Sequence, residues 1–231
     1  MEHVVHFGSK EIRFQLHYNG RKTLGITVTP ELEVRVTAPA GASLEKIKEK
    51  ILKRAPWIMR QEDFFLRFHP RTPARRFVSG ETHLFLGRQY RLKLQPGKKN
   101  LVHRLRNTLT VTLRPGSKAS KVLHAWYRQQ AQLLFPEITE GLLEKFSKYK
   151  IKPTGIYLQQ MPTRWGSCTP RGKVILNPEL IKAPRRCIEY VIIHELCHLV
   201  HHGHTRKFFD LQRQIMPDWE KWKEKLEREL N

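Results

Sequence analysis

The chain has 231 residues, a length that allows one large domain or two small ones with a substantial hydrophobic core. Hydrophobic residues make up 39% of it, including 5 Trp, 6 Tyr and 11 Phe, which indicates a globular protein and excludes a disordered one. Lys and Arg number 43 against 21 Asp and Glu, a formal net charge of +22, so the protein attracts polyanions such as nucleic acid.

These basic residues are dispersed, and no recognition helix, zinc finger or RNA-binding aromatic signature accompanies them. We therefore expect any nucleic-acid association to be non-specific and to occur through the basic surface. No apolar stretch approaches the roughly 18–20 residues that cross a bilayer, and no signal peptide is visible. The odd cysteine count, without Cys-x-x-Cys spacing, argues against disulfides and a cysteine-based zinc ribbon. We expect a cytoplasmic protein without membrane contact.

The first predicted elements are a β-hairpin and a helix. Period-2 alternation over residues 22–28 and 32–36 is typical of a hairpin. An amphipathic helix is predicted over residues 44–59, with Ser43 as its N-cap. The tract from residue 69 to 76, rich in proline and arginine, is the expected linker. We therefore divide the chain into a basic N-terminal hairpin-plus-helix region, residues 1–76, and a second domain, residues 77–231.

A similar hairpin-then-helix pattern opens the second domain. Residues 78–94 predict one hairpin with its turn at Gly87-Arg88, and residues 101–113 predict another. A long helix follows from about residue 120 to 149, and we expect Pro136 and Gly141 to divide it in two. The repeated pattern is compatible with an internal duplication, although hairpins followed by helices are common.

The last third of the chain mixes short strands and helices. Residues 155–158 and 173–177 predict strands, and the segment from Arg164 to Cys168 reads as a turn. Pro184 is expected to open a helix that carries the sequence His-Glu-Leu-Cys-His at residues 194–198.

This pentapeptide is the main functional signal in the sequence. Positions i and i+4 of a helix share one face, so the imidazoles of His194 and His198 converge on one point, a spacing that suits Zn²⁺. Glu195 lies about 100° around the helix, close enough to take a proton from a metal-bound water without being a ligand. The alternative is that the histidines cap a buried helix while Glu195 faces solvent. The apolar flanks argue against it, because unpartnered polar groups there are costly.

A catalytic zinc site needs a third protein ligand. His201 lies on the same helical face as the first two histidines if the helix continues, so it would stack beyond the metal. Gly203 suits a left-handed turn that ends the helix, after which His204 swings back toward the site and Thr205 caps the next helix. We therefore choose His204. The alternative is a carboxylate from the region that follows: Asp210, Asp218 or Glu220.

The residues from Thr163 to Cys168 and from His194 to Phe208 resemble the YgjP-like metallopeptidase family, which is related to SprT-like zinc peptidases. The similarity extends upstream to residues 21–23, 78–81 and 86–90. This resemblance implies an α+β, zincin-like fold with the active-site helix beside a small sheet. It also implies zinc held by His194, His198 and His204, with Glu195 as the catalytic acid/base. In metzincins a glycine follows the second histidine by three residues, whereas this chain has His201 there.

The segment around Arg164 permits two roles. Arg164 could stabilise a developing oxyanion, and the segment could line a cleft where a peptide adds as a strand. Alternatively it is a structural turn, with Gly166 allowing the bend and Trp165 packing, and this is the reading we favour. Cys168 as a fourth, inhibitory zinc ligand is a further alternative.

We therefore predict a zinc-dependent peptidase that cleaves protein or peptide substrates. We include among these substrates nucleic-acid-associated proteins recruited by the basic N-terminal region. The main alternative is a nucleic-acid-binding protein whose metal site is structural or vestigial, with steeply salt-dependent binding and no cleavage. A third hypothesis is a metal-dependent hydrolase acting on a non-peptide bond.

Overall fold

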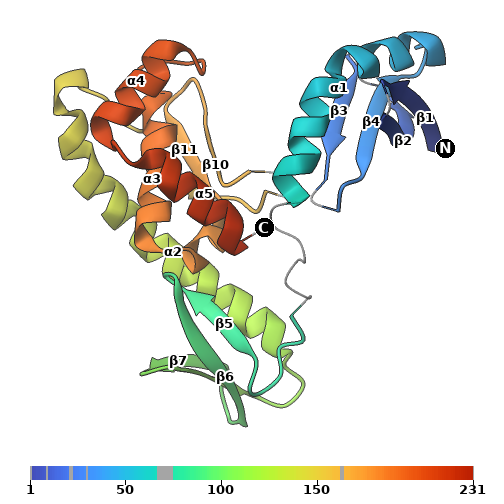
Figure 1. Ribbon diagram of the computed structural model, residues 1–231. Helices are drawn as coiled ribbons and strands as arrows, with labels where there is room; N and C mark the ends of the chain where they lie inside the picture. The colour runs from blue at the N-terminus through green and yellow to red at the C-terminus, as the bar shows by residue number, and fades with distance from the viewer. Residues whose placement is uncertain are drawn as a thin grey trace. The chain divides into compact units, whose positions relative to one another are not determined.

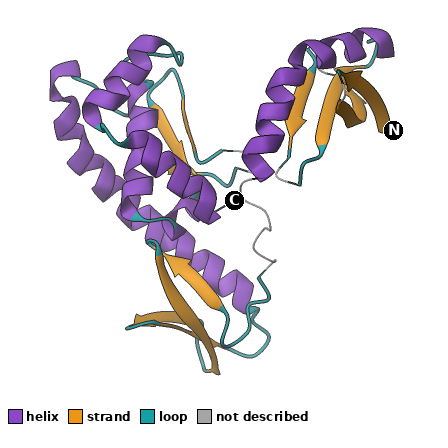
Figure 2. Ribbon diagram, viewed as in Figure 1, coloured by secondary structure: helices purple, strands orange, loops and turns teal. Residues whose placement is uncertain are grey.

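The computed structural model describes residues 2–8, 10–20, 23–29, 31–66, 75–161 and 164–230 (Figures 1 and 2). The chain folds as two compact units, residues 1–72 and 73–230, and each is described by itself. Most of the predicted linker, residues 69–74, lies outside the described residues. The division between residues 76 and 77 stays a prediction.

The first unit is a four-stranded sheet covered by one helix. Its elements are β1 (Glu2–Phe7), β2 (Lys10–Asn19), β3 (Gly25–Val28), β4 (Val34–Pro39) and α1 (Leu44–Leu66). The strand order is β1-β2-β4-β3, with β2 and β4 parallel and the other pairs antiparallel. Alternate residues of the strands pack against one face of α1 to form the core. Its buried residues are Val5, Ile12, Phe14, Leu16, Val28, Val34, Val36 and Ala38 from the sheet and Ile47, Ile51, Ala55 and Ile58 from the helix.

The second unit begins with the same arrangement. Its elements are β5 (Thr82–Phe85), β6 (Arg88–Pro96), β7 (Leu101–Leu105), β8 (Thr108–Leu113) and α2 (Ala119–Leu143). The order β5-β6-β8-β7 and the strand directions repeat those of the first sheet. The repeated sequence pattern is therefore a repeated topology. We call the two copies the first module, residues 2–66, and the second module, residues 82–143.

The structure of these modules differs from the prediction in three features. Strands β1 and β2 were not predicted. The β5–β6 turn lies at Leu86 and Gly87, one residue earlier than expected, and both residues have positive φ angles, 49° and 75°. Pro136 and Gly141 do not break α2, which runs through both and ends in the 3₁₀ helix η1 (Glu144–Tyr149). Phe135 and Ile138 are buried on either side of Pro136, so packing holds the helix together across the missing backbone donor.

The rest of the second unit is a small sheet with three helices. The strands β9 (Gly155–Leu158), β10 (Gly166–Cys168) and β11 (Lys173–Leu176) lie in the order β10-β11-β9. The helices are α3 (Arg185–Cys197), α4 (Arg206–Ile215) and α5 (Trp219–Leu230), and the 3₁₀ helix η2 (Pro178–Lys182) precedes α3. Half of the expected turn around Arg164 is thus strand β10, because it pairs with β11.

Helix α3, which carries the His-Glu-Leu-Cys-His sequence, is the centre of the second unit. It contacts strands β10 and β11 as well as helices α2, α4 and α5 (Figure 1). Its residues from Tyr190 to Ile193 are buried. The predicted α+β arrangement, with the motif helix beside a small sheet, is therefore confirmed. The three cysteines are free, as expected, and no described helix has the length and apolar character needed to cross a membrane.

Candidate metal centre

The structure brings together the three histidines that the sequence analysis selected. His194 and His198 come from the C-terminal end of α3, and His204 comes from the segment between α3 and α4. One ring nitrogen of each lies within 4.8 Å of the others. The Nε2 atoms of His194 and His204 are 3.0 Å apart. Among the described residues, this converging group contains no cysteine or carboxylate.

The chain reverses earlier than predicted. Helix α3 ends at Cys197, with His198 as a C-cap in the right-handed helical conformation. A turn follows, in which the His201 N–H donates to the Cys197 carbonyl oxygen at 2.9 Å. Gly203 does not have a positive φ angle, so the expected left-handed turn is wrong. Thr205 occupies the N-cap position of α4, but its side chain makes no capping hydrogen bond.

A buried amide orients the first histidine. The Nδ1 atom of His194 lies 2.9 Å from Oε1 of Gln212, a fully buried residue of α4. Because an amide oxygen only accepts, Nδ1 carries the proton and donates, which leaves the Nε2 lone pair free to bind a metal. The sequence analysis missed this residue. The available signal was a polar side chain on the apolar stripe of α4 formed by Phe208, Leu211 and Ile215.

The electrostatics of the site favour neutral imidazoles. Burial lowers the pKa of His194 to about 4, against a partial opposing effect from the Gln212 hydrogen bond. Burial also lowers the pKa of His198, and the nearby His204 adds to the effect. Neutral imidazole is the metal-binding form, and three such nitrogens converging on one point are the donor set of catalytic zinc. The residues present therefore fit a divalent transition metal.

An apolar residue supports all three histidines. The Phe208 ring is fully buried, and its centroid lies 4.7–4.9 Å from the centroids of the three imidazole rings. Such a wall limits the freedom of the rings, and it lowers the local dielectric around them.

The alternative ligands are engaged elsewhere. The three carboxylates form surface ion pairs: Asp210 with Arg206, Asp218 with Arg186, and Glu220 with Arg213. The Cys168 thiol lies in the cleft wall and donates to the carbonyl oxygen of Thr169 at 3.6 Å. Burial raises the pKa of this thiol to about 11, which disfavours the thiolate form that binds metals.

Glu195 is buried beside the histidines, with only 5% of its surface exposed. Strand β10 passes so close that a Cβ atom built on Gly166 would lie 2.6 Å from Oε1 of Glu195, so any larger residue there would displace the carboxyl group. Burial raises the pKa of Glu195 to about 8, and the positive charge of Arg164 partly opposes this shift. The carboxyl group is thus poised to hold a proton near neutral pH.

The histidines and Glu195 open onto a cleft of about 370 Å³. Its other wall is β10 and the residues around it: Arg164, Gly166, Ser167, Cys168, Thr169 and Pro170. The segment before β10 is anchored, because the Asn177 side chain donates to the Arg164 carbonyl oxygen at 3.4 Å and to that of Met161 at 2.8 Å. The backbone of Arg164 therefore has a structural role, because its carbonyl oxygen accepts the Asn177 hydrogen bond, while its charged side chain lines the cleft. Thr163 lies outside the described residues.

A histidine triad, a buried glutamate and an open cleft on an α+β scaffold together define a metallohydrolase-type site. The family model of the YgjP-like metallopeptidase domain matches residues 22–229, so the chain belongs to the YgjP-like metallopeptidase family. The chain is thus a metal-dependent peptidase, which acts on proteins or peptides.

One solved structure is also similar to this chain. It is the metallopeptidase zymogen jannalysin of Methanocaldococcus jannaschii, with 19% identity and a TM-score of 0.37 over 42% of this chain and 97% of that chain. A search of curated proteins found no match.

Proposed function

We propose that the chain is a zinc-dependent peptidase in which His194, His198 and His204 hold the metal and Glu195 is the general acid/base. The observation that carries this proposal is the convergence of three imidazole nitrogens beside a buried carboxyl group at a cleft. Bound zinc supplies a Lewis acid that polarises a carbonyl and acidifies water.

The role of Glu195 follows from its surroundings. Its carboxylate takes a proton from the attacking water and passes that proton to the leaving amine. The raised pKa of about 8 supports this role, because a carboxyl group with that pKa can hold a proton between the two transfers. The positive charge of a metal held by the three histidines would favour the ionised form of Glu195, which would prepare it to act first as a base.

Strand β10 provides a natural place for the substrate backbone. It is an edge strand in the order β10-β11-β9, and its residues line the cleft. An extended peptide that pairs with the free edge of β10 passes in front of Glu195. Arg164 at the same wall supplies positive charge for an oxyanion that develops on the scissile carbonyl.

A second candidate rests on the net charge of +22, which favours non-specific binding of nucleic acid. Because the chain is a peptidase, this charge would recruit nucleic-acid-associated proteins as substrates. Such recruitment would have a steep salt dependence.

The test compares two substitutions of the same type on α3. We expect Glu195→Gln to reduce hydrolysis of an unfolded protein substrate by about 10²–10⁴-fold, because it removes the proton acceptor. Glu189→Gln should leave activity nearly unchanged, since Glu189 forms ion pairs with Arg185 and Arg186. Elemental analysis should show equal zinc content in both variants. Equal turnover by the two variants would contradict the mechanism.

A further inference from the structure

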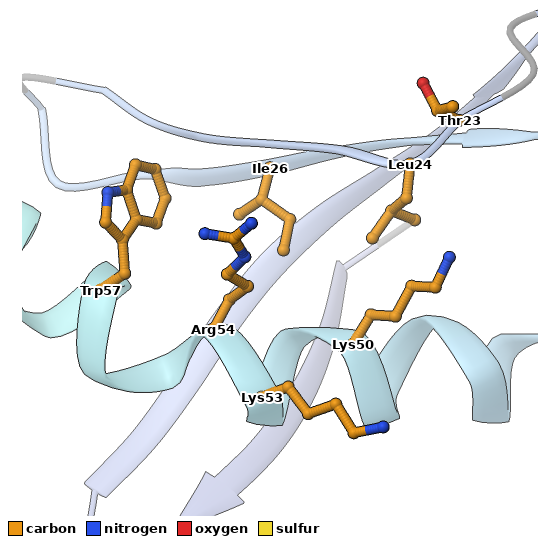
Figure 3. A pocket seen from close by; sticks show the side chains of 7 residues that line it. All are labelled: Thr23, Leu24, Ile26, Lys50, Lys53, Arg54 and Trp57. Carbon is orange, nitrogen blue, oxygen red and sulfur yellow. The ribbon is translucent and has the colours of Figure 1, made fainter. Parts of the chain in front are cut away.

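A groove in the first unit lies between the edge strand β3 and helix α1, and none of its lining residues lines the cleft of the metal centre (Figure 3). Its volume is about 490 Å³. Leu24 and Ile26 form an apolar floor at strand β3, and Trp57 of α1 closes one end. Both floor residues and Trp57 are only partly buried, so the groove exposes apolar surface.

The helix side of the groove is cationic. Lys50, Lys53 and Arg54 project from α1 around the floor, as Figure 3 shows. Lys53 forms an ion pair with Glu49 at 2.8 Å. In the part of the chain that the structure describes, Lys50 and Arg54 form no ion pair, although the Glu49 carboxylate interacts electrostatically with Lys50. An occupant with acidic groups would supply the missing charge.

The strand side of the groove offers backbone groups. Among the described strands, β3 is the last in the order β1-β2-β4-β3 and pairs only with β4, so none of them pairs with its other edge. An unpaired edge beside an apolar floor accepts an extended peptide as an added strand. A second hollow of about 330 Å³ continues the groove along α1, sharing Leu24, Lys50 and Lys53.

The second module shows that an open basic groove is not an inevitable result of this topology. The buried residues Leu123, Tyr127 and Ala131 of α2 match Ile47, Ile51 and Ala55 of α1 in spacing. On this alignment Lys50 corresponds to Trp126, which packs against Phe85 with their ring centroids 5.0 Å apart. Arg54 corresponds to Gln130. The unpaired cations are thus a property of the first module alone.

We propose that this groove binds an extended acidic polypeptide segment by adding it as a strand to β3. Residues at alternate positions of a strand share one face. An apolar side chain would occupy the floor against Ile26 and Trp57, while acidic side chains two residues away on the same face reach Lys50 and Arg54. The apolar floor and the free strand edge favour a peptide over nucleic acid. Nucleic acid would need hydrogen-bond donors for its phosphates and stacking surfaces for its bases along the whole groove.

The test uses fluorescently labelled peptides and anisotropy on the full chain carrying Glu195→Gln, which keeps the peptide intact. The binding peptide is Thr-Glu-Thr-Leu-Thr-Glu-Thr. The control, Thr-Thr-Glu-Leu-Glu-Thr-Thr, has the same composition but places its carboxylates on the opposite strand face from its leucine. We expect the first peptide to bind about tenfold more tightly or better. Equal affinities would overturn the proposal.

Matched charge reversals then locate the site. Lys50→Glu with Arg54→Glu should weaken the first peptide by about tenfold or more, because attraction becomes repulsion. Lys48→Glu with Arg60→Glu, on the same helix but outside the groove lining, should leave its affinity nearly unchanged. Circular dichroism confirms that both variants fold, and equal losses in the two would overturn the proposal.

Binding of a single-stranded dT15 oligonucleotide tests whether the groove binds nucleic acid instead of a peptide. Tighter binding of dT15 than of the peptide, abolished by the groove reversals and not by the control reversals, would assign the groove to nucleic acid and overturn the peptide proposal. Because binding alone is measured, these outcomes do not depend on whether the chain is a peptidase.

Discussion

The two modules share their strand order and strand directions, but their helices have different surroundings. The principal contacts of α1 are with β1 and β3 of its own sheet. In contrast, α2 contacts β7 and β8 and also η2, β9 and the motif helix α3. One module thus completes its core alone, whereas the other supports the metal centre through the second face of its helix.

The β-turns of the two modules show the same difference. At Gly8, between β1 and β2, an added Cβ would meet no atom within 4 Å. At Gly87, between β5 and β6, it would lie 2.7 Å from Cγ of Pro184, immediately before α3. The Gly87 N–H also donates to the Lys182 carbonyl oxygen at 2.9 Å. The comparison teaches that one topology serves as an independent unit or as a scaffold, depending on the residues outside its sheet.

We expect the largest difference between the two modules when a buried core side chain is replaced by alanine. Ile47 and Leu123 occupy matching positions on α1 and α2, and both are almost completely buried. Ile47→Ala and Leu123→Ala should each lower the free energy of unfolding of their own unit by about 2–5 kcal/mol, because each leaves a cavity. Hydrogen exchange resolved by segment measures the stability of each unit, and peptidase assays after heating measure the loss of activity. Only Leu123→Ala should lower the temperature at which activity is lost, and equal loss in both variants would contradict two separate units.

Glycine substitutions should produce the next largest difference. Gly166→Ala forces the Glu195 carboxylate to move, because the new Cβ would overlap Oε1. We expect a fall of about 100-fold in kcat/KM with zinc still bound, since small displacements of a catalytic group have effects of that size. Gly41→Ala in the first module places its Cβ in open space and should leave the kinetics unchanged. Full activity of Gly166→Ala would remove the proposed role of the close approach.

A smaller effect is expected at the amide behind His194. Gln212→Leu removes the acceptor for Nδ1, so zinc affinity should fall by about 10–100-fold. Gln214→Leu is the matched control on α4, because Gln214 bonds the Tyr149 hydroxyl at the surface. Competition with a zinc chelator measures both affinities. If Gln212→Leu binds zinc as tightly as the control, the hydrogen bond does not orient the ligand.

The smallest effect concerns pH. His83 in β5 is buried, and burial lowers its pKa from 6.5, although Glu81 at 3.0 Å opposes the shift. The folded chain therefore protonates His83 less readily than the unfolded chain does, so the second unit loses stability as the pH falls below about 6.5. Urea denaturation between pH 8 and 5.5 should show a weaker pH dependence for His83→Gln than for the wild type. Equal dependences would exclude His83 as a contributor.

The convergence of the three histidines was predictable because its information is local. The spacing of His194 and His198 on one helix, and the proximity of His204 in sequence, confine the three side chains to one region. The route of the chain was less predictable, because Gly203 can adopt many conformations and the tight turn after Cys197 depends on tertiary packing. Gln212 was missed because its partner lies on another helix.

The fold was predictable where alternation was clear, as in the β3–β4 and β7–β8 hairpins. The alternation of Ile12, Phe14 and Leu16 also marks β2, but it was overlooked in a polar segment. Strand β10 could not be predicted locally, because its three residues are ordered by pairing with β11. Helix α2 continues through Pro136 because contacts with other elements outweigh the local cost of proline.

The hydrogen bonds from Leu86 and Gly87 to the carbonyl oxygens of Ile181 and Lys182 have a consequence for biosynthesis. A ribosome releases the complete first module once residue 66 has emerged, so it can fold while translation continues. The second module must wait for partners nearly a hundred residues downstream before its turn is docked. During that interval, its unfinished surfaces are the part of the nascent chain most in need of chaperone protection.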